Sequence, residues 1–494
     1  MPSRRLKSES VAGAGGNRAR RTRSHRSIPW RMRRPCWTWS PNPSARSRRS
    51  MVETSADLSG DVSRSIPLLV RDLPRGYPAH DTAFSSRHGL SCKGRTMDVN
   101  RQQFLEDGYV ILRQVIPPDQ LDSLRHSYEI MVDRQRATWA QEDPPDGVWG
   151  RAAQPRLNLT SLADQIDEST ASTIEIWLHE NTQGASSQLL GVEDAAVTEM
   201  MLMCSPVSDH GPARWHRDFA PAHSSPVMGY AEDILDNGPR YVQWNLSLYD
   251  DDVLWVVPGS HVRCLTSDEN AQLERDAQAP LSSGVQTHLK AGDGVAYILP
   301  ILHWASNYST RMRRTIHGGF SMFTHYPNLS YLKQLSPQAR ETFGRWVKRS
   351  DDTMTRTEIA LRAALEADGA AYQQALQDLH PESGSMAMRQ STILLSKSAK
   401  RIQDLKRPAS GVSEEELSYA TGIHPMTMQC GQPMADRFSV AEAGRLWERF
   451  RWVDDRLRGD QDATCPGFQG GPTSYFFNDV PAELTVDNFI AQWS

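Results

Sequence analysis

The segment "ARWHRDFAP", residues 213–221, places an imidazole and a carboxylate two positions apart, at His216 and Asp218. Along a β-strand, residues i and i+2 point to the same face, so both side chains can bind one cation from a single strand end. The pair also has a simpler interpretation as an exposed polar pair, because this spacing arises by chance. Other residues must decide between a metal site and a polar surface.

A second histidine suited to the same ion, His303, follows a Gly-Asp turn and a largely apolar run in "KAGDGVAYILPILHW". Two histidines and one carboxylate make the facial triad of non-heme Fe(II) oxygenases, which leaves adjacent positions on the metal for a chelating co-substrate and dioxygen. We therefore expect His216, Asp218 and His303 to bind iron. Eight of the fifteen histidines lie in this region: His210, His216, His223, His261, His288, His303, His317 and His325.

Arginines in "STRMRRTIH" provide a carboxylate-binding group one strand further on. A guanidinium binds a carboxylate through two parallel hydrogen bonds, which a lysine cannot match. Arg311, Arg313 and Arg314 compete for this role. Because neighbouring residues of a strand point to opposite faces, only one of Arg313 and Arg314 can point into a barrel. His317, just beyond them, is a weaker alternative metal ligand, because it follows the arginines instead of preceding them.

Other prominent residues have structural interpretations. His261 in "PGSH" is expected to form a hydrogen bond at a turn, and Asp250–Asp252 lack the glycine and distal glutamate of a calcium loop. The large apolar side chains of this region are expected to fill the core when they are judged from their types alone: Met201, Trp215, Trp244, Trp255 and Trp304.

The order of secondary-structure signals indicates the fold class. "FLEDGYVIL" predicts a short helix that stops at Gly108, followed by a strand, and a longer helix begins near Pro117. From about residue 195 to 325, short β runs alternate with Pro-Gly and Gly-Asp turns, without long helices between them. This pattern favours a β-sandwich or barrel over a doubly wound sheet.

Helical periodicity returns after about residue 330. Ser439 and Glu442 have the spacing of a capping box ahead of "AGRLWERFRWVDDRL". The polar stretch 381–412 is a candidate linker between helical segments.

Charge is distributed unevenly along the chain. The 55 Lys and Arg and 59 Asp and Glu give a net charge of −4, yet the first 50 residues contain 14 of the basic residues and one acidic residue, Glu9. The remainder is acidic, so a nucleic-acid partner is not expected. No apolar run is long enough to span a membrane. Six scattered cysteines without a C-x-x-C pair fit a reducing compartment, so we expect a cytoplasmic protein whose oligomeric state the sequence does not set.

The basic N-terminal region, rich in Arg, Ser, Gly and Pro, is predicted to be disordered. Its composition is also typical of an organelle transit peptide or of a basic arm for nucleic acid. A further interpretation is that translation starts at Met97, because globular sequence begins just after it. We favour this last interpretation.

Together these motifs resemble the phytanoyl-CoA dioxygenase-like family of Fe(II)- and 2-oxoglutarate-dependent oxygenases. "FLEDGYVIL", "WHRD", "VVPGSH" and "GDGVAY…HWASN…RR" occur in the order of that family over residues 99–325. The resemblance implies an α+β fold: a double-stranded β-helix (jelly-roll, cupin-like) core with flanking helices and a helical C-terminal extension. The expected organisation is a basic extension (1–96), an oxygenase domain (97–330) and a mainly helical region (331–494).

The resemblance also implies roles for individual residues. It gives the same iron ligands, His216, Asp218 and His303, and it assigns 2-oxoglutarate binding to Arg314, eleven positions after the distal histidine. Two further co-substrate contacts and one upstream basic residue have candidate counterparts at Trp244, Met201 and Arg156.

Some positions depart from the family pattern, and the segment "YDDDVLW" before "VVPGSH" lacks the usual glycine. Where family members often have a small hydroxyl residue, this chain has Ala305, and Ser306 is its candidate substitute.

The implied reaction consumes 2-oxoglutarate and O2, releases succinate and CO2, and hydroxylates a small organic molecule. Halogenating relatives have a small residue in place of Asp218, so its presence favours hydroxylation, or a desaturation or ring-forming variant. Two other functions stay open. One is a non-catalytic binding protein on the same barrel, and the other is a zinc-dependent hydrolase that uses the same ligands with an activated water.

Overall fold

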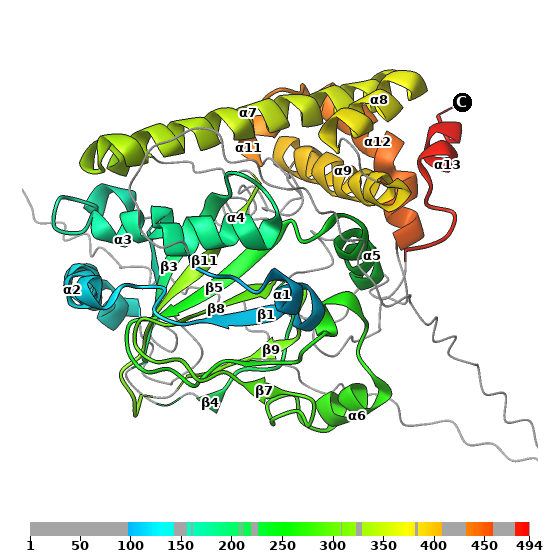
Figure 1. Cartoon of the computed structure of the whole chain (residues 1–494). Helices are drawn as coiled ribbons and strands as arrows, with labels where there is room; N and C mark the ends of the chain where they lie inside the picture. Colours follow the sequence, from blue (N-terminus) through cyan, green and yellow to red (C-terminus); the bar gives the residue numbers. More distant parts are fainter. Residues whose placement is uncertain are drawn as a thin grey trace, which may run out of the picture. The chain divides into compact units, whose positions relative to one another are not determined.

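The computed structural model describes residues 97–142, 156–159, 162–206, 209, 211–218, 226–307, 309–322, 329–380, 384–407, 431–457 and 480–493. The expected N-terminal extension, residues 1–96, lies outside the described residues. The described chain combines helices with antiparallel β-sheets (Figure 1). None of its helices has the length and apolar character that a bilayer crossing requires.

A six-stranded antiparallel sheet is the largest β element. Its strand order is β1-β8-β5-β11-β3-β2, so segments far apart in the sequence become neighbours. The strands are β1 (Tyr109–Leu112), β8 (Gly294–Ile298), β5 (Tyr241–Ser247), β11 (Arg314–Ser321), β3 (Ala196–Cys204) and β2 (Arg156–Asn158). Their content of Val, Ile, Thr, Tyr and Trp suits a pleated sheet that is covered on both faces.

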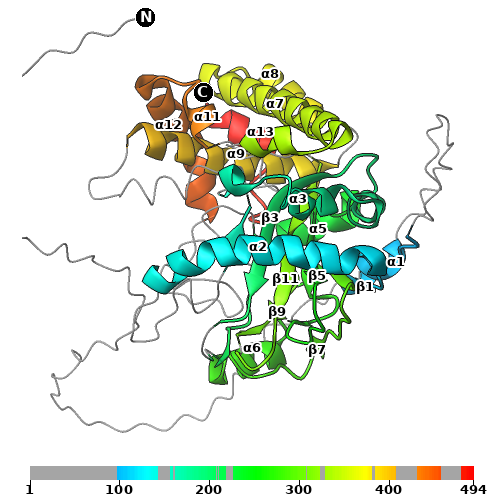
Figure 2. The ribbon, with the colours of Figure 1, turned by 90° about the vertical axis from the view of Figure 1, so that its left-hand side faces the viewer.

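Helices cover one face of this sheet. Val242, Trp244 and Leu246 of β5 belong to the largest apolar core, together with Phe343 and Trp346 from a helix above. The covering helices are α2 (Pro118–Glu142), α3 (Ser172–Glu175), α4 (Ala185–Leu190) and α7 (Pro337–Glu366). Figure 2 shows α2 crossing in front of the sheet.

Two smaller sheets complete the β part. They have the orders β7-β6-β9 and β10-β4. Their strands are β4 (Gly211–Pro212), β6 (Trp255–Val256), β7 (Val285–Gln286), β9 (His303–Trp304) and β10 (Ser306–Asn307). In Figure 1, β9, β7 and β4 lie on the side of the large sheet opposite α4 and α7.

The predicted helix–turn–strand at the start of the folded chain is confirmed. Helix α1 (Arg101–Asp107) begins after Asn100, whose side chain accepts a hydrogen bond from the Gln103 backbone N–H. It ends at Gly108, where φ is 80°. A Cβ atom at this position would lie 2.3 Å from Nδ1 of His261. Glycine is therefore required both for the left-handed backbone and for close packing.

The C-terminal helices form a second apolar core. Helix α7 takes part in both cores, with Phe343 and Trp346 in the first and Leu361 and Ala364 in the second. The domain boundary expected at residue 330 therefore precedes α7, a helix whose residues belong to both apolar cores. The other helices are α5 (Val227–Asn237), α6 (Ser267–Arg275), α8 (Gly369–Leu379), α9 (Ser385–Lys406), α11 (Gln432–Ala435), α12 (Val440–Leu457) and α13 (Val486–Ala491).

The capping box predicted ahead of α12 is confirmed. The backbone N–H of Glu442 donates to Oγ of Ser439 at 3.2 Å, and the backbone N–H of Ser439 donates to Oε2 of Glu442 at 2.7 Å. This reciprocal pair satisfies two backbone donors at the start of the helix.

The polar stretch 381–412 is not a linker, because most of it is the buried helix α9. Its hydroxyl groups donate back to carbonyls of the same helix, as Ser391 does to Ala387 at 2.8 Å. Its charged residue Lys397 lies 3.4 Å from Asp454 of α12, with both side chains 2% exposed. Polar side chains that find such partners can be buried, which composition alone does not reveal.

We predict that Lys397→Met lowers the free energy of unfolding by about 3–5 kcal/mol, because it leaves the Asp454 carboxylate buried without this cation. Chemical denaturation measures the change. The matched control is Lys400→Met on the same helix, whose partly exposed pair with Asp404 should contribute less than about 1 kcal/mol. Equal effects of the two substitutions would contradict the prediction.

Candidate metal centre

Two of the predicted ligands face each other across a backbone pairing. The N–H of His216 donates to the carbonyl of His303 at 3.0 Å, and the N–H of His303 donates back at 3.0 Å. In an antiparallel pair of this kind the two side chains leave on the same side of the ladder. The imidazole centroids are accordingly 4.4 Å apart.

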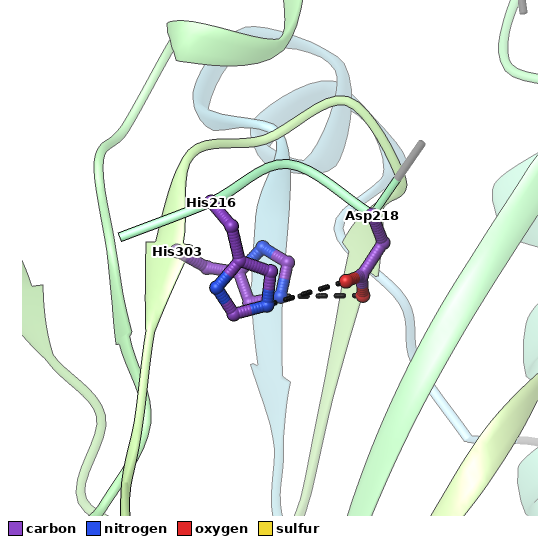
Figure 3. A group of neighbouring side chains, drawn as sticks. All are labelled: His216, Asp218 and His303. Atoms are coloured by element: carbon purple, nitrogen blue, oxygen red, sulfur yellow. Dashed lines mark ion pairs between the residues drawn. The ribbon is translucent and has the colours of Figure 1, made fainter. Parts of the chain in front are cut away.

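Asp218 closes the group, as Figure 3 shows. Its Oδ1 lies 3.3 Å from Nε2 of His216, and its Oδ2 lies 3.2 Å from Nε2 of His303. The His303 side chain is 5% exposed, whereas those of His216 and Asp218 are 19% and 22% exposed. The centre is therefore buried on one side and accessible on the other.

The other ring nitrogens hold both imidazoles in one orientation. Nδ1 of His216 donates to the Arg214 carbonyl at 2.7 Å, and Nδ1 of His303 donates to the Ile301 carbonyl at 3.0 Å. Because Nδ1 is the donor to a carbonyl in each ring, Nε2 is the nitrogen that faces Asp218 and is left to bind a metal ion. Backbone carbonyls of this kind are the usual outer partners of metal-binding histidines.

The charges of the group stabilise one another. Burial alone would lower the pKa of His216, but the hydrogen bond and charge of Asp218 outweigh it and raise that pKa. Burial would raise the pKa of Asp218, but the two histidines hold it well below its usual range. A carboxylate that stays ionised beside two imidazoles is suited to bind a cation.

The separations between these atoms fit a divalent metal ion. The candidate ligand atoms of His216, Asp218 and His303 all lie within 4.8 Å of one another. Ligands about 2.1 Å from an ion and at right angles to each other are about 3 Å apart, close to the carboxylate–imidazole separations here. Two nitrogens and one carboxylate oxygen are the donor set of the non-heme iron facial triad.

A buried polar layer that was not predicted lies behind Asp218. Gln243 of β5 donates through Nε2 to Oδ2 of Asp218 at 2.7 Å and contacts the Tyr297 hydroxyl at 2.9 Å. The same Nε2 lies 3.2 Å from Nε2 of His317, whose Nδ1 is 2.6 Å from Oδ1 of Asn245. Burial lowers the pKa of His317 to about 3, so its ring is neutral. His317 thus contacts Gln243 and does not join the triad.

Glu199 of β3 adds a carboxyl group to the same face of the sheet. The register pairs Glu199 with Gly319, and Gly319 with Gln243, so Glu199 lies across the small glycine from the polar layer. Burial, with a smaller contribution from the charge of Asp218, raises the pKa of Glu199 to about 7. The positive charge of Arg156, the candidate upstream basic residue, lowers the pKa of Glu199 and so opposes this shift.

Two of the residues predicted to bind 2-oxoglutarate, Arg314 and Trp244, lie on the side of the large sheet that faces the helices, away from the triad. Arg314 lies on the helix side of the sheet, where its Nε donates to Oε1 of Glu129 in α2 at 2.7 Å. Trp244 is also on that side, fully buried, with its indole N–H donating to Oγ of Ser186. Met201, paired in register with His317, is outside that apolar core.

The neighbouring arginine points the other way. Arg313 donates from Nε to Oδ2 of Asp251 at 2.9 Å, and the hydroxyl of Thr315 donates to the same oxygen at 2.7 Å. The positive charge of Arg313 contributes to the lowered pKa of His317. The alternation of the strand therefore puts Arg313, Thr315 and His317 on the triad's side of the sheet.

Three of the eight histidines, His210, His223 and His325, lie outside the described residues. His261 has the structural role that its turn position predicts. It is fully buried, and its Nε2 is 3.0 Å from the carbonyl of Leu105.

Residues 104–316 match the protein family described as phytanoyl-CoA dioxygenase (PhyH). AviO1 from Streptomyces viridochromogenes Tue57 is similar at 19% identity, over 45% of this chain and 92% of AviO1, with a TM-score of 0.33. EctD from S. alaskensis is similar at 16% identity, over 47% of this chain and 80% of EctD, with a TM-score of 0.33. EvdO2 from Micromonospora carbonacea var. aurantiaca, in complex with 2-oxoglutarate, is similar at 16% identity over 46% of this chain and 92% of EvdO2, with a TM-score of 0.30. No curated protein matches the sequence.

We predict that Glu199 makes the metal-free protein less stable as the pH rises. Its folded-state pKa, about 7, lies above the ordinary value of 4.5, so folding takes up a proton between these values. Glu199→Gln should therefore gain stability over the unmodified protein from about pH 4.5 upward, by at most about 3 kcal/mol above pH 7. Denaturation across this pH range measures the difference. In the control Glu193→Gln, at an exposed position, the difference in the free energy of unfolding from the unmodified protein should not vary with pH.

Proposed function

We propose that residues 104–316, which match the phytanoyl-CoA dioxygenase family, form a non-heme iron oxygenase domain that uses 2-oxoglutarate as co-substrate. In this proposal the chain hydroxylates a C–H bond of a small organic molecule, with His216, Asp218 and His303 as the iron ligands. The observation that carries the proposal is the convergence of two Nε2 atoms and one carboxylate, while both Nδ1 atoms are bound to backbone carbonyls.

The protein's own residues prepare this centre. When bound, iron(II) with 2-oxoglutarate and dioxygen supplies the oxidation, with succinate and CO2 as co-products. The triad would hold the ion on one side and leave its other positions for co-substrate and oxygen. Asp218 occupies the carboxylate position, which favours hydroxylation over halogenation. His303, nearly inaccessible, anchors the buried side of the centre.

The two consecutive arginines divide two tasks in this proposal. Arg314 is engaged by Glu129 through Nε at 2.7 Å and Nη2 at 3.2 Å, on the helix side of the sheet. Arg313 is on the triad's side, where its bond to Asp251 uses Nε. A guanidinium has further N–H groups in its fork that can receive a carboxylate. The carboxylate of 2-oxoglutarate remote from the metal is therefore assigned to Arg313, with Arg314 as the alternative.

A double-stranded β-helix is the finer fold assignment that we propose. Two features support it: β5 of the large antiparallel sheet presents polar residues toward the triad and apolar residues toward the helices, and a smaller sheet contributes His303. The substrate would enter between the two sheets, where His216 and Asp218 are partly exposed. Small-molecule sites commonly lie at the mouth of such barrels.

We expect purified protein with Fe(II), ascorbate and 2-oxoglutarate to form succinate in the presence of O2. His216→Ala, Asp218→Ala and His303→Ala should each reduce the rate by more than about 100-fold, because even an outer partner of a metal ligand is worth about 10–100-fold. His288→Ala, an exposed histidine, is the control. Iron binding without succinate, across a broad substrate panel, would favour the binding protein. Zinc-dependent hydrolysis without an oxygen requirement would favour the hydrolase.

The arginine assignment predicts that substitutions of Arg313 and Arg314 differ in their effect on the KM for 2-oxoglutarate. Arg313→Gln should raise the KM for 2-oxoglutarate by about 10-fold or more, the value of one lost charge-assisted hydrogen bond. Arg314→Gln should leave this KM nearly unchanged. Both substitutions should lower the thermal stability, because Asp251 and Glu129 each lose an ion-pair partner, so the KM from succinate kinetics decides the question. The reverse result would return the role to Arg314.

A further inference from the structure

Oδ2 of Asp218, which lies 3.2 Å from Nε2 of His303, has a second protein partner that no assigned role explains. Gln243 is 3% exposed and lies in the middle of the large sheet, on β5. Its Nε2 donates to Oδ2 of Asp218 at 2.7 Å, a charge-assisted hydrogen bond. Oδ1 of the same carboxylate faces the imidazole of His216.

Neighbouring strands fix the orientation of this amide. Its Nε2 is 2.9 Å from the Tyr297 hydroxyl of β8 and 3.2 Å from Nε2 of His317 in β11. Nδ1–H of His317 donates to Asn245 Oδ1 at 2.6 Å, so Nε2 of that ring is an acceptor. The amide therefore presents its NH2 group, with one N–H donated to the Asp218 carboxylate and the second facing the Tyr297 hydroxyl and the His317 lone pair. The opposite amide orientation would put two oxygens 2.7 Å apart.

From this geometry we propose that Gln243 is a positioning residue for the metal ligand Asp218. Its hydrogen bond fixes Oδ2, the oxygen that also faces His303, and thereby orients Oδ1 toward His216. His317 and Asn245 support the amide from behind. The inference rests on the proposed function only in taking Asp218 as a metal ligand.

The direct test is the affinity of the metal-free protein for Co(II), a spectroscopic substitute for Fe(II), followed by its d–d absorption. Gln243→Met preserves the length of the side chain but removes both N–H donors. We expect it to weaken Co(II) binding by about 10–100-fold, the usual effect of an outer partner, and to change the d–d spectrum. Gln243→Glu, which puts an acid group beside Asp218 in place of the amide donor, is the second variant if Gln243→Met does not fold.

Controls separate positioning from general damage to the fold. Gln135→Met removes another buried amide, which donates to Gln165, and should leave Co(II) affinity unchanged within about twofold. In an Asp218→Ala background, Gln243→Met should have no further effect on Co(II) affinity, because coupled residues are not additive. Unchanged Co(II) binding in a folded Gln243→Met protein would overturn this inference alone. Failure of the unmodified protein to bind Co(II) would instead overturn the metal centre itself.

Discussion

The centre depends on one backbone contact, the mutual pairing of His216 and His303. Each histidine has a tryptophan beside it in the sequence: Trp215 precedes His216, and Trp304 follows His303. Trp215 and Trp304 stack with centroids 5.6 Å apart and planes within 9°, inside a separate apolar cluster. Because adjacent strand residues point to opposite faces, the same pairing that stacks the tryptophans brings the imidazoles together. Trp215 thus anchors the H-x-D motif.

The large sheet separates two environments. On β5, Val242, Trp244 and Leu246 enter the apolar core, whereas Gln243 and Asn245, between them, are 3% exposed and face the triad. Buried polar groups are costly without partners, and here each has one. The result is a rigid polar wall behind Asp218, while the apolar side supplies most of the stabilisation of the sheet.

The sequence predicted the triad because His216 and Asp218 have a local H-x-D spacing, and His303 follows a recognisable Gly-Asp turn and apolar run in the order of the family motifs. It did not identify Gln243, and it considered His317 only as a weaker alternative metal ligand. Their alternation with apolar residues was a usable signal, but alternation alone also describes a sheet face in water. Helix α9 was missed for a related reason, since the partners that allow its serines and Lys397 to be buried are set by the tertiary structure.

The arginine pair shows why register is the hardest feature to predict. A shift of one residue along a strand exchanges its two faces, so a family position counted from His303 can fall on either side. Here the count reaches Arg314, but the hydrogen-bond register of β11 turns that residue to Glu129 on α2. Arg313 is then left facing Asp251 and the triad's side. The two adjacent arginines therefore act on opposite faces of the sheet. Arg314 binds Glu129 of α2, and Arg313 pairs with Asp251 on the triad's side.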